Sequence, residues 1–150
     1  MTKTRAIVAA EAIAHQKTSY DVVGIPAVIF TDPEIATVGL TEEQAKRQGY
    51  QVRVGRFHYQ ANGRALCMDQ PEGFVKIIGD QASGLLLGAH IVGAEASHLI
   101  SEATLALEMR AQVEDLALTV HPHPTLSELL MESAEATLGH GIHLYQNSKF

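Results

Sequence analysis

The chain has 150 residues, of which 46% are hydrophobic and 19% are charged. This length and composition are typical of one folded domain and exclude a disordered or fibrous protein. Eleven lysines and arginines against 17 acidic residues give a formal net charge of −6, which argues against a nucleic-acid-binding protein. The single cysteine, Cys67, cannot form an intrachain disulfide and is typical of a reduced, cytoplasmic protein.

The two most apolar stretches are not typical of a leader or a membrane span. Glu11 interrupts the N-terminal stretch, which therefore favours an amphipathic helix over a signal peptide. The run Gly84–Ala96 is too short to cross a bilayer and contains His90 and Glu95. We therefore expect no targeting segment and no membrane partner.

The first half of the chain predicts a helix and then short strands around a second helix. Apolar residues at helical spacing lie near the N-terminus, and a polar connector leads from Thr18 to Pro26. Thr41 and Gln44 have the pattern of a capping box at the start of a helix. In chain order the predicted elements are helix Thr4–Gln16, strands Ala27–Thr31 and Ile35–Leu40, a helix from Thr41 to Gly49, and strand Gln51–Tyr59.

The second half begins with strands and ends with helices. Residues Ala61–Gln70 fit either a loop or a short helix, and the short polar connection Asp80–Ser83 predicts a hairpin. The remaining predicted elements are strands Phe74–Gly79 and Gly84–Gly93 and helices Ala94–Arg110, Val113–Val120 and Thr125–Leu138. This order predicts an α+β fold, in which an antiparallel sheet has helices packed largely on one face.

The segment His121–Glu128, with the sequence HPHPTLSE, carries the most informative polar residues. Two prolines restrict the backbone on either side of His123 and keep it out of a regular helix. The carboxylate of Glu128 could accept a hydrogen bond from one nitrogen of this imidazole. The ring would then be oriented, and its other nitrogen would be free for proton transfer.

The same segment also allows structural interpretations. Thr125 and Glu128 have the spacing of a capping box, in which Glu128 would do no more than reach back to the Thr125 backbone N–H. His121 and His123, with a second pair of histidines in the C-terminal tail, raise the question of a metal site. Zinc needs three or four convergent ligands, and this spacing is weak support for them, so we expect no metal.

Five segments resemble, in their order and spacing, the C-terminal interface domain of the flavin disulfide reductases, and within that family the dihydrolipoamide dehydrogenases. They are IPAVIFTDPEIATVGLTEEQAKRQG, NGRA, EGFVKII, GLLLGAHIVGAEASHLISEATLALEM and HPHPTLSE. The resemblance runs from about Ile25 to Gly139, and its most specific part is HPTLSE. It implies the interface-domain fold for residues 21–150, with residues 1–20 as a helix and linker from the end of the flavin-binding portion.

The resemblance also implies a function. Enzymes of this kind are homodimers with FAD and a redox-active CxxxxC disulfide, and they oxidise dihydrolipoamide and pass the electrons to NAD. The resemblance implies that His123 is the acid–base residue, that Glu128 orients it, and that the pair enters the active site of the partner subunit. It also implies that the backbone of His121 and Pro122 lies close to the partner's flavin.

The chain itself contains no CxxxxC motif and no dinucleotide-binding fingerprint. We therefore expect it to be inactive alone and to hold neither FAD nor NAD by itself, as an excised domain or a truncated product. Two alternatives are an association module without catalysis and the interface domain of another flavin disulfide reductase, such as glutathione reductase. A small metal-binding protein is a weaker alternative.

Overall fold

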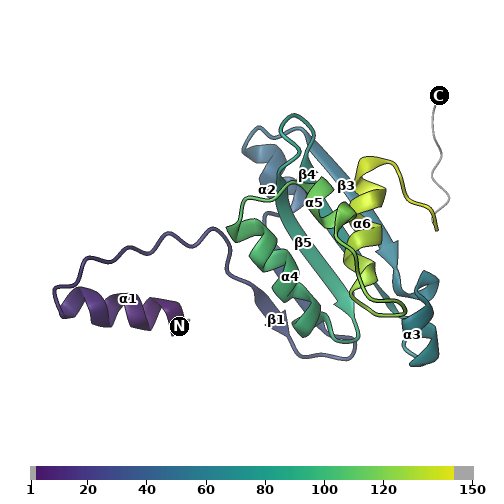
Figure 1. Ribbon diagram of the computed structural model, residues 1–150, viewed down its shortest axis with the longest axis horizontal. Coiled ribbons are helices and arrows are strands. Elements are labelled where there is room, and N and C mark those ends of the chain that lie inside the picture. The colour runs from purple at the N-terminus through teal and green to yellow at the C-terminus, as the bar shows by residue number, and fades with distance from the viewer. Residues whose placement is uncertain (1–2, 144–150) are drawn as a thin grey trace.

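The computed structural model describes residues 3–143, with one sheet-and-helix body and a separate N-terminal helix on an extended connector (Figure 1). The helices are α1 (Lys3–Ile13), α2 (Glu42–Arg47), a 3-10 turn (Tyr59–Ala61), α3 (Gly63–Cys67), α4 (Ala96–Glu108), α5 (Val113–Leu118) and α6 (Glu128–Leu138). The strands are β1 (Ala27–Ile29), β2 (Ile35–Gly39), β3 (Val52–His58), β4 (Gly73–Asp80) and β5 (Leu86–Gly93).

The five strands form one sheet in the order β1-β2-β5-β4-β3. Every neighbouring pair is antiparallel, and the hairpin between β4 and β5 is present as predicted. Helices α4 and α6 pack directly on the sheet, and α5 packs against α6 (Figure 1). The prediction of an α+β fold with helices largely on one face is confirmed.

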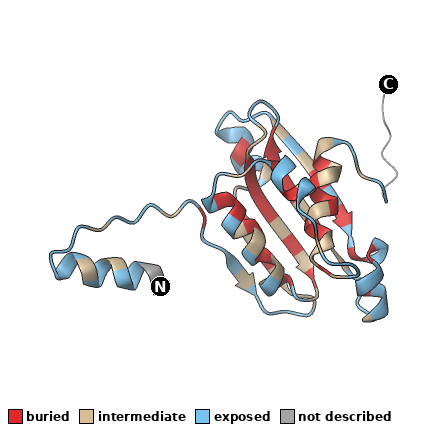
Figure 2. Ribbon diagram, in the orientation of Figure 1, coloured by how far each residue is buried: buried red, intermediate tan, exposed pale blue. Residues whose placement is uncertain are grey.

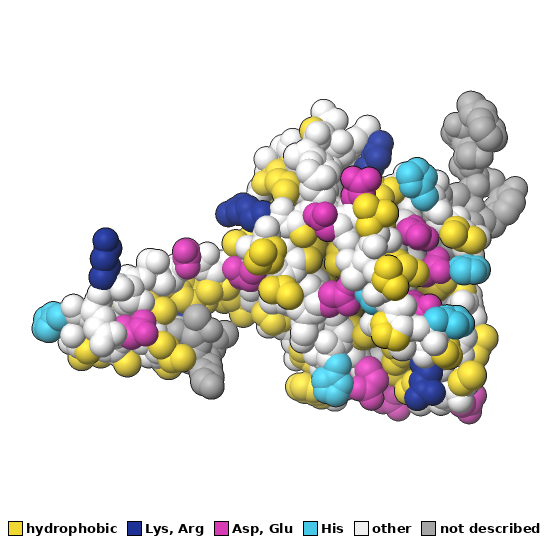
Figure 3. All heavy atoms as spheres, viewed as in Figure 1, with side chains coloured by type: hydrophobic (Ala, Val, Ile, Leu, Met, Phe, Trp, Pro, Cys, Tyr) yellow, Lys and Arg dark blue, Asp and Glu magenta, His cyan; other side chains and the backbone are white. Residues whose placement is uncertain are grey.

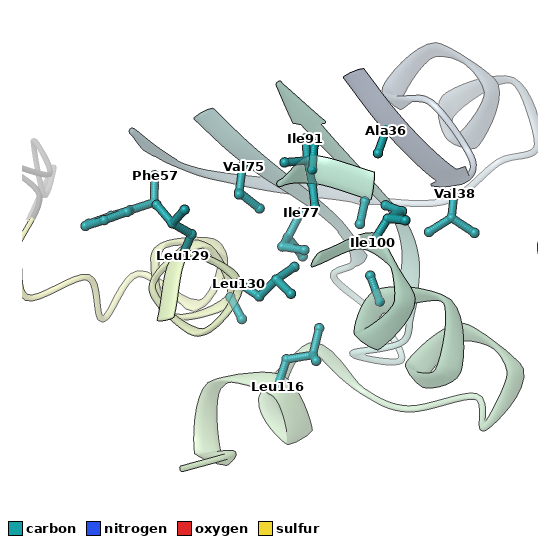
Figure 4. Close-up of a cluster of buried hydrophobic side chains, with 14 of the residues drawn as sticks. Ala36, Val38, Phe57, Val75, Ile77, Ile91, Ile100, Leu116, Leu129 and Leu130 are labelled. Carbon is teal, nitrogen blue, oxygen red and sulfur yellow. The ribbon is translucent and has the colours of Figure 1, made fainter. Parts of the chain in front are cut away.

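The core lies between the sheet and these helices, where buried residues line the inner sides of both layers (Figure 2). Figure 4 shows Leu129 and Leu130 of α6 pointing toward Val75 and Ile77 of β4. Losing one such leucine side chain to alanine typically costs about 2–5 kcal/mol. A smaller cluster of Ala45, Ile78 and Leu87 lies under α2, on the opposite face of the sheet, with Leu40 and Val52 packed against it.

Helix α6 is attached to the sheet by polar and steric contacts as well as by its leucines. The buried hydroxyl of Ser133 donates to the carbonyl of Val75 at 3.0 Å. Gly55 on β3 faces the backbone of α6 so closely that a Cβ there would overlap Ser133 and Thr137. This close approach sets the position of the helix whose first residue is Glu128.

Several predicted boundaries are wrong by a few residues. Strand β1 ends at Ile29, and in the turn that follows the Thr31 hydroxyl donates to the Pro33 carbonyl at 2.8 Å. The ambiguous segment after β3 is a short helix, α3, whose N-cap is Asn62. The capping box of Thr41 and Gln44 is present as predicted.

The N-terminal helix contacts its own connector. The Thr18 hydroxyl donates to Glu11 at 2.8 Å, and Arg5 donates to the Tyr20 hydroxyl at 3.2 Å. The connector joins the body where the backbone N–H groups of residues 23 and 24 both donate to Glu108 at the end of α4. No helix within residues 3–143 has the length and apolar content needed to cross a membrane.

Candidate functional site

The corner between helices α5 and α6 holds the residues that the sequence singles out. The Nδ1 atom of His123 lies 2.9 Å from Oε1 of Glu128. The His123 side chain is 80% exposed, whereas that of Glu128 is only 16% exposed. A solvent-facing imidazole is therefore held by a carboxylate that the fold largely covers.

Glu128 combines the two roles that the sequence left as alternatives. Its second oxygen, Oε2, accepts the backbone N–H of Thr125 at 2.8 Å. This is one of the two bonds of a capping box, whereas the Thr125 hydroxyl donates to the Pro122 carbonyl at 2.7 Å. One carboxylate thus fixes both the imidazole and the backbone that follows it.

The prediction that the last helix begins at Thr125 is wrong. Helix α6 begins at Glu128, with Ser127 as its N-cap. The side-chain amide of Asn62, next to α3, donates to the Thr125 carbonyl at 3.0 Å. Since its N–H, hydroxyl and carbonyl are all bonded to other parts of the fold, Thr125 anchors the corner instead of opening the helix.

The hydrogen bond to Glu128 determines which nitrogen of a neutral His123 carries the proton. A carboxylate only accepts, so Nδ1 is the donor and Nε2 is the unprotonated nitrogen. Within residues 3–143, Nε2 has no hydrogen-bond partner. It is therefore free to exchange a proton with another molecule, which is what general acid–base catalysis requires.

The surroundings of Glu128 favour its charged form. Partial burial by itself raises the pKa of this carboxyl, but the bonds from the Thr125 N–H and His123, with the charges of His123 and His121, outweigh it. The pKa of Glu128 therefore lies below its ordinary value of 4.5. The carboxylate stays ionised at neutral pH and continues to orient the imidazole.

We expect Glu128→Gln to destabilise the chain by about 1–2 kcal/mol at neutral pH, because it removes a charged hydrogen-bond acceptor. The pKa of Glu128 is lower in the folded than in the unfolded state, so its contribution is complete above 4.5 and is lost as the pH falls through the lower folded-state value. Urea unfolding of both proteins at about pH 7 and about pH 3 measures this. A difference that stays constant between the two pH values, or one equalled by Glu114→Gln on the exposed side of α5, would contradict it.

His121 has a different environment from His123. Its Nε2 lies 2.9 Å from Oε1 of Glu102 on α4, and its Nδ1 lies 2.9 Å from the Thr119 carbonyl oxygen. Its side chain is only 5% exposed, whereas Pro122 beside it is exposed. The two histidines therefore do not share a ligand. No group of three or more His, Cys, Asp or Glu residues within 3–143 is arranged to hold a metal ion.

A hollow of about 310 Å³ lies beside the imidazole of His123. Its lining combines apolar and ionisable side chains, among them Phe57, Met131, Glu132 and His143. His143 and Glu132 form another pair, with Nδ1 2.6 Å from Oε1, and Figure 3 shows histidine and acidic side chains close together on this part of the surface. A second hollow, of about 320 Å³, lies near the end of α4 and has no histidine or carboxylate in its lining.

Residues 25–134 match the family described as pyridine nucleotide-disulphide oxidoreductase, dimerisation domain. The chain belongs to this family. Among curated relatives of this dimerisation domain, the dihydrolipoyl dehydrogenase of Halobacterium salinarum is 54% identical over 91% of the chain. The dihydrolipoyl dehydrogenase of Thermus scotoductus is 54% identical over 92% of the chain. The chain spans 29% and 30% of the length of these two relatives.

Solved structures have the same fold as this dimerisation domain. LpdA from Mycobacterium tuberculosis is 30% identical, with a TM-score of 0.76 over 85% of this chain and 28% of its own. The flavoprotein disulfide reductase RclA from Escherichia coli, at 24% identity, has a TM-score of 0.80 over 86% of this chain and 30% of its own. The resemblance to the interface domain of the flavin disulfide reductases is confirmed.

Sequence reasoning missed two residues that hold the corner of the dimerisation domain. Asn62, which bonds the Thr125 carbonyl, lies in a segment that the sequence left ambiguous. Glu102, which bonds His121, lies beside the apolar stripe of α4. A half-buried acid in that position is a weak indication that its carboxylate has a hydrogen-bonding partner. Both partners lie many residues away along the chain, so no local pattern identifies them.

Proposed function

We propose that this chain is the dimerisation domain of a dihydrolipoamide dehydrogenase, and that its homodimer places His123 and Glu128 of each subunit in the active site of the other. The observation that carries the proposal is the exposed imidazole whose Nδ1 is held by Glu128 while Nε2 faces solvent. A group that serves its own subunit would be expected to face its own fold. The relatives named dihydrolipoyl dehydrogenase favour this enzyme over glutathione reductase.

The proposed role of His123 is to move a proton from a dithiol substrate. Nε2 takes the proton of one thiol, and the resulting thiolate attacks one sulfur of the partner subunit's disulfide. A new S–S bond forms to the substrate, the old S–S bond breaks, and the other sulfur leaves as a thiolate. Glu128 stabilises the imidazolium that forms, because its carboxylate accepts from Nδ1 throughout.

FAD and NAD are the cofactors that we assign to the longer enzyme. FAD, when bound, supplies the transfer of electrons from the dithiol pair to NAD. In this chain both ring nitrogens of His121 are hydrogen-bonded within the fold. The groups that would contact the partner's flavin are therefore the backbone of His121 and the exposed Pro122. The corner fits that role, since the His121 side chain next to the proline is paired with Glu102.

We further propose that the chain is inactive by itself, because it holds half of a composite site and one cysteine. Residues 1–20 would belong to the flavin-binding portion and residues 21–150 to the dimerisation domain. Support for this division comes from Glu108, which ties residues 23 and 24 to the body while α1 bonds with its own connector. We place the assembled enzyme in the cytoplasm.

A purely associative role is the second candidate. Large apolar side chains stand exposed on the helical side of the body, as expected of a surface that another subunit covers. They are Leu105, Met109, Leu118, Val120 and Ile142. In this alternative the His123–Glu128 pair has no partner to act on, and the two candidates differ in whether His123 is needed for turnover.

Hybrid dimers of the longer enzyme test the proposed composite site. One subunit carries His123→Gln, and the other lacks its redox-active disulfide, so each homodimer is inactive. If His123 serves the partner, random mixing restores about a quarter of the wild-type turnover, because half of the dimers are hybrids with one intact site of two. If His123 serves its own subunit, neither site of the hybrid is intact and the mixture stays inactive, which would refute the proposal.

A further inference from the structure

The backbone segment that carries His123 is held at both ends. At its far end Thr125 is bonded to Glu128 and Asn62, as described above. At its near end the imidazole of His121 lies between the Glu102 carboxylate and the Thr119 carbonyl. The ring of His121 is thereby the link between the segment and the middle of helix α4.

His121 cannot exchange protons with a substrate in this position. Its side chain is 5% exposed, and each ring nitrogen faces an oxygen that accepts. Both bonds are made together when the ring carries both protons, and the ring then also forms an ion pair with Glu102. The arrangement is therefore suited to holding the segment in place and not to catalysis.

Few other hydrogen bonds hold the residues between the two ends, the main one being that from the Thr125 hydroxyl to the Pro122 carbonyl at 2.7 Å. Pro122 and Pro124 have no N–H, so they cannot donate backbone hydrogen bonds. Within residues 3–143, the His123 side chain is bonded to Glu128 alone. The direction in which the imidazole points thus depends on where the two anchored ends lie.

We propose that Glu102 is a positioning residue for His123: its carboxylate fixes the buried ring of His121 to α4 and so holds the backbone from which the exposed imidazole of His123 projects. Glu102 does not touch the reacting groups and acts through His121. The proposal rests on the proposed function only for its effect on turnover, since its effect on the order of His123 belongs to this chain alone.

Nuclear magnetic resonance relaxation of the 150-residue chain tests this inference. In the parent protein we expect a backbone order parameter of about 0.85 at His123, and Glu102→Ala should lower it to below about 0.6. Glu102→Gln should restore most of the order, because its amide oxygen still accepts from Nε2. Glu114→Ala, which removes an exposed acid on α5, should leave the order parameter unchanged.

His121→Ala provides a second variant that should have the same effect, including in the case that Glu102→Ala fails to fold. Because the two side chains act as one link, the double variant should be no more mobile at His123 than either single variant. Unchanged order at His123 in folded Glu102→Ala or His121→Ala would overturn the proposal. Additive losses in the double variant would overturn it as well.

Turnover of the longer enzyme adds a readout that separates this inference from the proposed function. A displacement of about 1 Å at a reacting group costs about 100-fold in rate, so Glu102→Ala should lower kcat by about 10- to 100-fold with little change in KM. Glu102→Gln should recover most of that loss. If His123→Gln leaves turnover intact while Glu102→Ala still mobilises His123, the proposed function fails and the positioning role stands. If His123→Gln abolishes turnover while His123 stays ordered in Glu102→Ala, the positioning role fails and the proposed function stands.

Discussion

Replacement of His123 by glutamine is expected to lower the dithiol turnover of the longer enzyme by about 10²- to 10⁴-fold, the contribution of a well-placed general acid–base group. Glutamine keeps a hydrogen-bonding end near Glu128 but cannot take a proton from a thiol at neutral pH. The flavin should remain bound, which its absorbance reports. Steady-state kinetics with dihydrolipoamide and NAD measure the loss.

The pH dependence of turnover in this variant distinguishes the loss of a general base from a change in the structure of the site. Thiols ionise without help above about pH 8.5, so the deficit of His123→Gln should shrink as the pH rises through that range. His98→Gln is a matched control, because His98 is also 80% exposed and its Nδ1 lies 2.6 Å from Glu95 at the start of α4. Near-normal turnover of His123→Gln, or an equal loss in His98→Gln, would rule out the assigned role.

A large effect on stability is also expected from Gly55→Ala. A methyl group on this residue would overlap the Ser133 carbonyl and the Thr137 N–H, which belong to the backbone of α6 and cannot rotate away. Helix α6 must then move off the sheet, and the Ser133 hydrogen bond to Val75 lengthens. We expect a loss of about 3 kcal/mol, at the upper end of the range for overpacked cores.

Thermal unfolding of the chain measures this loss, which corresponds to a fall in Tm of about 6–12 °C for a domain of this size. Gly63→Ala is the matched control, since a Cβ at Gly63 would have no neighbour within 4 Å. Alanine there should change stability by less than about 1 kcal/mol, in the stabilising direction. A Tm for Gly55→Ala equal to that of the parent would show that α6 does not need its close approach to β3.

The order of elements was predictable because it depends on local patterns. Turn residues separate the strands, apolar spacing marks the helices, and the capping box of Thr41 and Gln44 marks the start of α2. The side chains of His123 and Glu128 are close in sequence, and prolines on either side of His123 limit the backbone there. The sequence could therefore suggest the pairing of these two residues, although the same spacing also fitted a capping box between Thr125 and Glu128.

The other contacts of the corner join residues that are far apart in the sequence and come together only in the packed fold. Asn62 donates to the Thr125 carbonyl across 63 positions of the chain, and Glu102 bonds His121 across 19. The strand order places β5 between β2 and β4, so that α4 packs on β5 and β2 while α6 packs on β3 and β4. No local sequence pattern predicts such pairs, because the two residues of each pair come into contact only when the helices and the sheet pack together.

The sequence by itself predicted the α+β fold and the resemblance to the family, and it offered the His123–Glu128 pair as one of two interpretations, since each depends on order and spacing along the chain. Tertiary structure alone decided that Glu128 serves both His123 and Thr125, that His121 is buried against α4, and that the His123 ring faces solvent. Burial and hydrogen-bond partners depend on which surfaces pack together, and that is a property of the whole fold.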